Sequence, residues 1–256
     1  MLISIRNPHS VEAVLRTRPK DVQRIQLAGR GIHASWERVE SLAKELKIPL
    51  SFGGGSEKDF RSIGRGPKGN PKNSNDDPGR QGGSHAMVQE KTGVPLEELF
   101  QGAASRKNGH GLWLALDQIQ DPHNLGAIFR SAAFFGVQGI ILTQERSAPL
   151  SNAVYDVASG GVEYVPFVVQ PNLKQALDYA KKAGVWVLGT SEHASDTLNT
   201  VGKDRPWLVV LGNEETGLRR LTEESCDVLC RIPASGSIGS LNVAVSAGIL
   251  ISTLTG

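Results

Sequence analysis

The residues of this chain that are best suited to chemistry lie in one polar turn and the segment after it, Asp117 to Gly136. Asn124 carries an amide, which both donates and accepts hydrogen bonds, and Arg130 carries a guanidinium, which is charged and only donates them. An apolar run, 112–116, precedes them and is typical of a buried strand. An ordinary strand, loop and helix with a surface arginine would show the same pattern, so the rest of the chain must decide.

A helix is predicted to position these two residues. Asp121 and Pro122 are typical of a helix start, and Gly136 is typical of a helix end. The apolar residues between them recur with helical spacing and predict one buried face, made of Leu125, Ile128, Phe129, Ala132 and Ala133. Arg130 lies about 120° from the centre of that face on a helix of ~3.6 residues per turn. The helix therefore presents Arg130 away from the core.

Three later loops combine glycine with polar residues, and each follows a predicted strand. They contain Thr190; Gly212, Glu214 and Gly217; and Ile232, Ser240, Leu241 and Asn242. Glycine lets a ligand approach the backbone closely, and Ser237 or Ser240 is the predicted cap of the apolar helix that follows the third loop. None of the loops matches G-x-G-x-x-G or G-x-x-x-x-G-K-[ST], which disfavours dinucleotide or ATP binding.

Strands and helices alternate from residue 112 onward. Strands are predicted at 112–116, 137–142, 164–168, 185–189, 207–211 and 228–232, and helices near 124–135, 151–159, 172–183, 217–225 and 241–254. This rhythm is typical of an α/β domain in which helices cover both faces of a mostly parallel sheet. Ligands of such sheets bind at the carboxyl ends of the strands, where the three loops lie.

The first hundred residues predict a smaller α/β unit. It has a helix after Pro8 with Ser10 as its cap, strands at 22–27, 48–52 and 84–91, and helices at 34–46 and 96–100. The segment 53–83 is rich in Gly, Pro and Asn and is predicted to be flexible, because it has little apolar surface to bury. The predicted domains are thus 1–100, a linker at 101–111, and 112–256.

Composition bounds the class of protein. The chain has 256 residues, 39% apolar and 21% charged, which is typical of a globular protein. No apolar run reaches the ~18–20 residues that span a membrane, and no secretory signal is recognised. The two cysteines, Cys226 and Cys230, are predicted to be buried thiols, since no further Cys or nearby His would complete a metal site. We expect a cytoplasmic protein that binds no metal or membrane.

The charge distribution suggests an anionic partner. Residues 1–110 hold 18 Lys and Arg against 12 Asp and Glu, whereas residues 111–256 hold 10 against 14. A basic amino-terminal part favours contact with nucleic acid. A solvated basic surface without such a partner explains the same numbers equally well, and 53–83 is either an RNA-touching arm or a plain loop.

Taken together, three segments resemble the signature motifs of the SpoU/TrmH family of RNA 2′-O-ribose methyltransferases. They are 121–132, which contains Asn124 and Arg130; 211–218, which contains Glu214; and 232–245, which contains Ser240 and Asn242. Their order and spacing match the family over about 145 residues of the chain. The first hundred residues resemble the family's small RNA-binding domain, although Asn7 replaces its usual Gly and the segment 64–83 is longer.

The resemblance implies a fold, a cofactor and site roles. The fold would be a SPOUT-type domain with a trefoil knot, threaded after about Leu211, and the protein would be a homodimer. S-adenosylmethionine (SAM) would donate the methyl group without a metal. Arg130, Asn124, Glu214, Ser240 and Asn242 would be the catalytic residues. Thr190, Gly212, Gly217, Ile232 and Leu241 would bind SAM.

The resemblance also implies a substrate. The layout is most similar to family members that methylate a guanosine of 23S rRNA. The first alternative is a tRNA guanosine methyltransferase. It ranks second because the related tRNA enzymes lack this type of amino-terminal domain. A non-catalytic RNA-binding protein of ribosome assembly, with the same fold, is the third; loss of Asn124, Arg130 or Asn242 would have favoured it, and all three are present.

Overall fold

The computed structural model describes residues 1–28, 33–53, 83–103, 111–213 and 215–255. It divides into two compact units, Met1–Gln89 and Glu90–Gly256. The sequence analysis placed residues 90–100 in the first domain and 101–111 in a linker. In the structure Leu99, Phe100 and Ala103 lie in the core of the second unit, and residues 104–110 of the linker lie outside the described residues.

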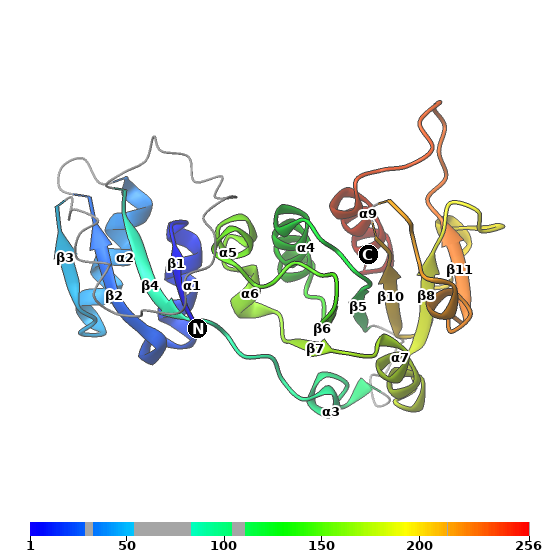
Figure 1. Ribbon diagram of the computed structural model, residues 1–256, viewed down its shortest axis with the longest axis horizontal. Helices are drawn as coiled ribbons and strands as arrows, with labels where there is room; N and C mark the ends of the chain where they lie inside the picture. Colours follow the sequence, from blue (N-terminus) through cyan, green and yellow to red (C-terminus); the bar gives the residue numbers. More distant parts are fainter. Residues whose placement is uncertain (29–32, 54–82, 104–110, 214, 256) are drawn as a thin grey trace, which may run out of the picture. The chain divides into compact units, whose positions relative to one another are not determined.

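The first unit is a four-stranded sheet with two helices (Figure 1). Its elements are β1 Leu2–Ile5, α1 Pro8–Thr17, a 3-10 turn at Pro19–Asp21, β2 Val22–Leu27, α2 Ala34–Glu45, β3 Leu50–Phe52 and β4 His85–Gln89. The strand order is β1-β4-β2-β3, with β2 and β3 parallel and the other pairs antiparallel. The sequence analysis predicted this α/β unit but missed β1. The segment predicted to be flexible, 53–83, lies almost wholly outside the described residues.

Asn7, and not Ser10, caps α1. The Asn7 side-chain oxygen accepts hydrogen bonds from the backbone N–H groups of His9, at 2.9 Å, and Ser10, at 3.4 Å. The prediction of Ser10 as the cap is therefore wrong, because the helix begins at Pro8 and Ser10 is buried within it. A proline at the first helical position has no N–H to satisfy, which suits this helix start.

The second unit contains a seven-stranded sheet in which every described strand pair is parallel. The strand order is β7-β6-β5-β10-β8-β11-β9. The strands are β5 Leu112–Leu116, β6 Gly139–Thr143, β7 Phe167–Gln170, β8 Trp186–Thr190, β9 Asp196–Thr197, β10 Trp207–Leu211 and β11 Val228–Arg231. The predicted parallel α/β fold is confirmed.

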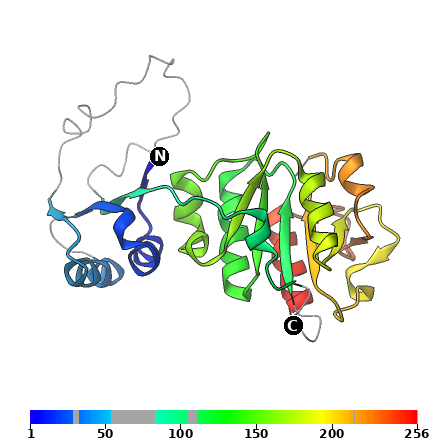
Figure 2. The same cartoon turned by 90° about the horizontal axis from the view of Figure 1, so that it is seen from below.

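Helices cover both faces of this sheet. They are α3 Leu96–Leu99, α4 Pro122–Phe135, α5 Asn152–Ala158, α6 Gly161–Tyr164, α7 Leu173–Lys182, α8 Arg220–Glu223 and α9 Val243–Thr255, with a 3-10 turn at Leu198–Thr200. Figure 2 shows α7 in front of the strands and α9 behind them. Trp113 and Ala115 of β5 pack with α7, while α9 contacts β5 and β10 from the other face. Alternate residues of a strand point to opposite faces, so the buried strands are apolar throughout.

The helix that carries Arg130 has the predicted ends. Asp121 caps α4 by accepting a hydrogen bond from the His123 N–H at 2.8 Å, and Gly136 ends it with φ 71°. The predicted apolar face is buried except for Ala133, which is partly exposed.

Two predicted elements of the second unit differ from the structure. The strand predicted at 164–168 begins only at Phe167, because 161–164 forms the short helix α6. The helix predicted at 217–225 is reduced to α8, Arg220–Glu223. Gly217 has φ 68°, a left-handed conformation that cannot belong to a right-handed helix.

Candidate active site

Three neighbouring strands bring the predicted donor-binding residues to one edge of the sheet. Thr190 is the last residue of β8, Gly212 follows β10 directly, and Ile232 follows β11 directly. The sheet order places these strands side by side as β10-β8-β11. Because all three are parallel, their carboxyl ends meet at the same edge, which is where α/β sheets bind ligands.

The loop 212–218 is tightly closed by its glycines. Asn213 and Gly217 exchange two backbone hydrogen bonds of 3.0 Å. A Cβ atom on Gly212 would lie 2.3 Å from the carbonyl carbon of Gly217, so only glycine fits there. Gly217 itself needs its left-handed φ of 68°. Glu214, the predicted catalytic residue of this loop, lies outside the described residues.

Side chains fasten this loop to its neighbours. The Asn213 oxygen accepts hydrogen bonds from the N–H groups of Glu215 and Thr216, and its amide nitrogen donates to the Gln118 carbonyl at 2.9 Å. The Thr190 hydroxyl donates to the Val210 carbonyl at 3.0 Å, which joins the end of β8 to β10, the strand that leads into the loop. The sequence analysis gave Asn213 no role, although its position between Gly212 and Glu214 was a signal for one.

Asn124 and Asn242 meet directly, although they come from the first and third motifs. The Asn242 amide nitrogen donates to the Asn124 side-chain oxygen at 2.9 Å. The Asn242 oxygen accepts from the N–H groups of Ala244, at 2.9 Å, and Val245, at 3.3 Å, at the start of α9. Asn242 thus caps α9, and the prediction of Ser237 or Ser240 as the cap is wrong. Asparagine and serine cap equally well, so local sequence did not decide between them.

Arg130 lies on the exposed side of α4, as predicted. It follows Asn124 by six residues, which corresponds to about 9 Å along a helix axis. Its backbone is fixed by α6, because a Cβ atom on Gly161 would lie 2.5 Å from the Phe129 carbonyl oxygen and 2.9 Å from the Arg130 nitrogen. The α4 backbone is therefore rigidly seated where the arginine side chain leaves it.

The edge of the sheet fits a ligand with both apolar and hydrogen-bonding parts. Leu241 is 52% exposed, Ile232 is partly exposed, and Ser240 is exposed. Exposed apolar side chains beside glycine loops suit the adenosine of SAM, whose base can pack on them while the backbone binds its polar atoms. The residues present therefore fit SAM.

The two cysteines take no part in this site. Burial raises the pKa of the Cys226 thiol to about 12 and that of the Cys230 thiol to about 11. Thiols with raised pKa values hold their protons at neutral pH and are poor nucleophiles. Both are free cysteines, and the described residues contain no cluster of three or more His, Cys, Asp or Glu that could hold a metal ion.

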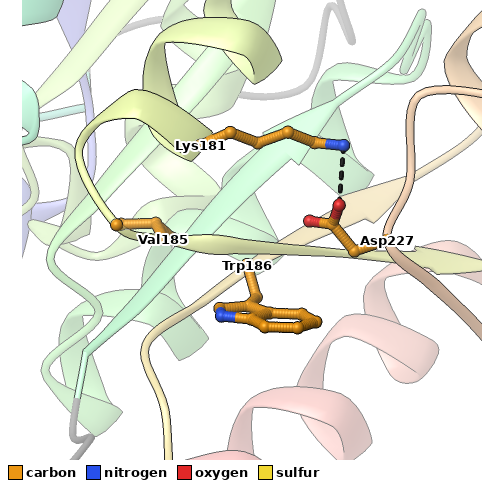
Figure 3. A pocket seen from close by; sticks show the side chains of 5 residues that line it. Lys181, Val185, Trp186 and Asp227 are labelled. Carbon is orange, nitrogen blue, oxygen red and sulfur yellow. Dashed lines mark hydrogen bonds and ion pairs between the residues drawn. The ribbon is translucent and has the colours of Figure 1, made fainter.

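A pocket at the opposite edge of the sheet is not formed by the predicted site residues. It is lined by Lys181, Gly184, Val185, Trp186 and Asp227 (Figure 3). Lys181 and Asp227 close one side of it with an ion pair of 2.7 Å, and Asp227 also accepts the Val187 N–H at 2.8 Å. Trp186 begins β8, whereas Thr190 ends it, so the pocket and the glycine loops lie at different ends of the strand.

Comparison with known families matches residues 111–252 to the SpoU rRNA Methylase family. A relative named 23S rRNA (guanosine-2′-O-)-methyltransferase RlmB, from Nitrosomonas europaea, is 48% identical over 61% of this chain, and the match spans 58% of that relative. A relative of the same name from Pseudomonas aeruginosa is 36% identical over 95% of this chain and 92% of its own length.

A solved structure is similar in fold over nearly the whole chain. The SpoU methyltransferase AviRb from Streptomyces viridochromogenes, in complex with AdoMet, gives a TM-score of 0.75 at 20% identity. The match covers 99% of this chain and 89% of that one. The described part of the chain, moreover, contains no helix of the length and apolar character that a membrane span requires.

Proposed function

The chain belongs to the SpoU rRNA methylase family, and on that premise we propose that it transfers a methyl group from SAM to a ribose 2′-hydroxyl of RNA. The substrate we propose is a guanosine of 23S rRNA, as named for both relatives described above. The observation that carries the proposal is the hydrogen bond between Asn124 and Asn242, which joins the first and third motifs at one site.

The donor site is proposed at the carboxyl ends of β8, β10 and β11. SAM, when bound, supplies a methyl group already activated by its sulfonium, so positioning can provide much of the remaining rate enhancement. The proposed SAM-binding residues are Thr190, Gly212, Gly217, Ile232 and Leu241. Thr190 would act by holding β8 against β10 through its hydroxyl.

Arg130 and Asn124 are proposed to hold the RNA. A guanidinium has five donors and no acceptor, so Arg130 would anchor the phosphate beside the reacting ribose and orient the 2′-hydroxyl. Asn124 would contact the ribose, and Asn242 would fix the Asn124 side chain through their 2.9 Å hydrogen bond. Glu214 and Ser240 are proposed as the remaining catalytic residues, together with Arg130, Asn124 and Asn242.

The experiment that tests this function measures labelled methyl transfer from SAM to undermodified 23S rRNA and, in parallel, to unmodified tRNA. Arg130→Ala should lower transfer at least a hundredfold, on the order of the loss that misplaced reacting groups cause, while SAM binding is retained. Arg205→Gln is the control, since Arg205 lies two residues before β10, at the other end of the strands, and pairs with Asp204.

Each outcome of this experiment has one meaning. Mapping 2′-O-methylguanosine in the 23S product would support the proposed substrate. Transfer to tRNA alone would overturn the substrate and leave the chemistry in place. A chain that binds no SAM and transfers no methyl would instead be a non-catalytic RNA-binding protein.

The first unit is proposed to bind the RNA substrate. Exposed basic side chains on it supply the positive charge that contact with phosphates needs. They are Arg6, Arg16, Lys20, Arg24, Arg38, Lys44 and Lys47. The first unit would then recognise RNA, and the second unit would bind SAM.

The second unit is proposed to form a homodimer and to contain the trefoil knot of its family. The neighbouring helices α4 and α9 leave Phe134 82% exposed and Val245 51% exposed, which is typical of a surface covered by a partner. We propose the cytoplasm as the compartment, since ribosomal RNA is the proposed substrate.

A further inference from the structure

The turn after β5 contains a buried carboxylate that none of the proposed catalytic steps uses. Asp117 is 1% exposed. Its Oδ2 accepts hydrogen bonds from Arg219 Nε at 3.1 Å and from the Thr222 hydroxyl at 2.9 Å. Its Oδ1 has no hydrogen bond of good geometry among the described residues, but it lies 2.8 Å from Arg219 Nη2, so the ion pair satisfies it.

This contact joins segments that are far apart in sequence. Asp117 is separated from Arg219 by 102 positions and from Thr222 by 105. Arg219 and Thr222 lie at the start of α8, immediately after the loop 212–218. We name Asp117, Arg219 and Thr222 the carboxylate clamp.

The same turn also holds the other end of that loop. The Asp117 N–H donates to the Leu211 carbonyl at 2.8 Å, and the Gln118 carbonyl accepts from the Asn213 amide at 2.9 Å. Gln118 has φ 63°, an uncommon conformation for a residue other than glycine. The loop 212–218 is therefore held at its beginning and its end by a single turn, Asp117–Gln118, which follows β5 and precedes the first motif.

Apolar packing cannot replace these contacts. The helix α8 has only four residues, and Thr222 is its single buried one. Leu218 is only partly buried against the core, and Leu221 is 61% exposed. A loop with little buried apolar surface depends on polar contacts for its shape.

We propose that Asp117 is a positioning residue for the methyl donor, which acts through Arg219 and Thr222 to hold the loop 212–218 in its SAM-binding shape. This inference rests on the proposed function. It assigns the clamp to donor affinity and not to the transfer step, because the clamp residues contact the segments that flank the loop, whereas Arg130 and Asn124 belong to α4.

The test compares two adjacent arginines. Arg219→Gln breaks the ion pair but can still donate one hydrogen bond to Asp117, so the fold is preserved. Arg220→Gln is the matched control, because Arg220 forms a surface ion pair with Glu224, at 3.2 Å, and both side chains are more than half exposed. Thr222→Val is a second test, which keeps the ion pair and deletes one hydrogen bond.

Three quantities are measured for each variant. Calorimetry gives the Kd for SAM without RNA, steady-state kinetics give kcat and KM, and hydrogen exchange of the Asn213 and Gly217 amides follows the loop without SAM. Arg219→Gln should raise the Kd and KM for SAM about tenfold, as expected for a lost charge-assisted hydrogen bond. It should speed exchange at both amides and leave kcat at saturating SAM within about twofold. Thr222→Val should change the same quantities in the same direction.

The outcomes separate this inference from the function on which it rests. Equal SAM affinities for Arg219→Gln and Arg220→Gln would overturn the inference alone. A loss of kcat in proportion to unfolded protein, with an unchanged Kd, would also overturn it, because the clamp would then only stabilise the fold. A wild-type chain that binds no SAM would overturn the proposed function and this inference together.

Discussion

At the scale of single residues, Asn242 serves two structural purposes with one amide group. Its oxygen caps α9, and its nitrogen holds the side chain of Asn124. An amide is suited to both because its oxygen accepts while its nitrogen donates, whereas an ionised aspartate has no donor and a serine has a single oxygen on a shorter side chain.

Substitutions at Asn242 should therefore separate stability from activity. Asn242→Ser keeps a capping oxygen, so the free energy of unfolding should change by less than about 0.5 kcal/mol, while Asn242→Ala should lose about 1 kcal/mol. Both variants release Asn124, and both should lower kcat by about a hundredfold. Thermal unfolding and methyl transfer measure the two effects. A serine variant with wild-type kcat would contradict a role for the link to Asn124.

At the scale of elements, the sequence predicted correctly those helix ends that are determined by residues within one turn of the end. Asp121, Pro122 and Gly136 marked the ends of α4 correctly, because a cap, a proline and a left-handed glycine act within one turn of the chain. The caps of α1 and α9 were predicted wrongly, since an asparagine and nearby serines could each cap. At α9 the capping Asn242 is also held by a long-range contact with Asn124, which local sequence does not encode. The length of α8 was overestimated, because Gly217 is held in a left-handed conformation by its bridge to Asn213 and cannot begin a helix.

The candidate site was predictable only in part for the same reason. The spacing of apolar residues correctly predicted that Arg130 lies outside the core. The order of the motifs pointed to Asn124 and Asn242 as site residues, and the structure brings these two side chains together. The position of Asn213 between Gly212 and Glu214 was a signal for some role, but no local pattern indicated that Asn213 would contact Gln118 or Asp117 would contact Arg219, because these partners lie 95 and 102 positions away. Contacts of that range follow from strand order, which the spacing of apolar residues does not encode.

The close approach of Gly212 to Gly217 gives a prediction for the loop as a whole. Gly212→Ala would place a Cβ atom 2.3 Å from backbone, which cannot move without opening the Asn213–Gly217 bridge. We expect a loss of about 1–3 kcal/mol of unfolding free energy, as for overpacking in a core, and weaker SAM binding. Gly236→Ala is the control, since its Cβ atom meets nothing within 4 Å. Equal melting temperatures for the two variants would contradict the prediction that only glycine fits at position 212.

At the scale of the whole molecule, the exposed apolar side chains of α4 and α9 predict the oligomeric state. Phe134→Glu should raise the dimer dissociation constant about thirtyfold or more, because it would bury a charge in the proposed interface. Light scattering on a sizing column measures the mass. Trp186→Glu is the control, since Trp186 is 43% exposed at the start of β8. A wild-type chain of monomer mass would contradict the proposed dimer.

The central pairing of β5 with β10 also has a consequence for how quickly the protein can fold. These strands are joined in register, Leu112 with Trp207 to Leu116 with Leu211, although about ninety residues separate them along the chain. Closing such a long stretch of chain costs conformational entropy before the paired strands gain contacts. Proteins in which a larger fraction of the contacts is long-range therefore fold more slowly. Asn124 and Asn242 of the candidate site are also far apart along the chain, by 118 positions. We therefore expect these two residues to come together late in folding. Donor binding would then report the last stage of refolding, well after secondary structure has formed.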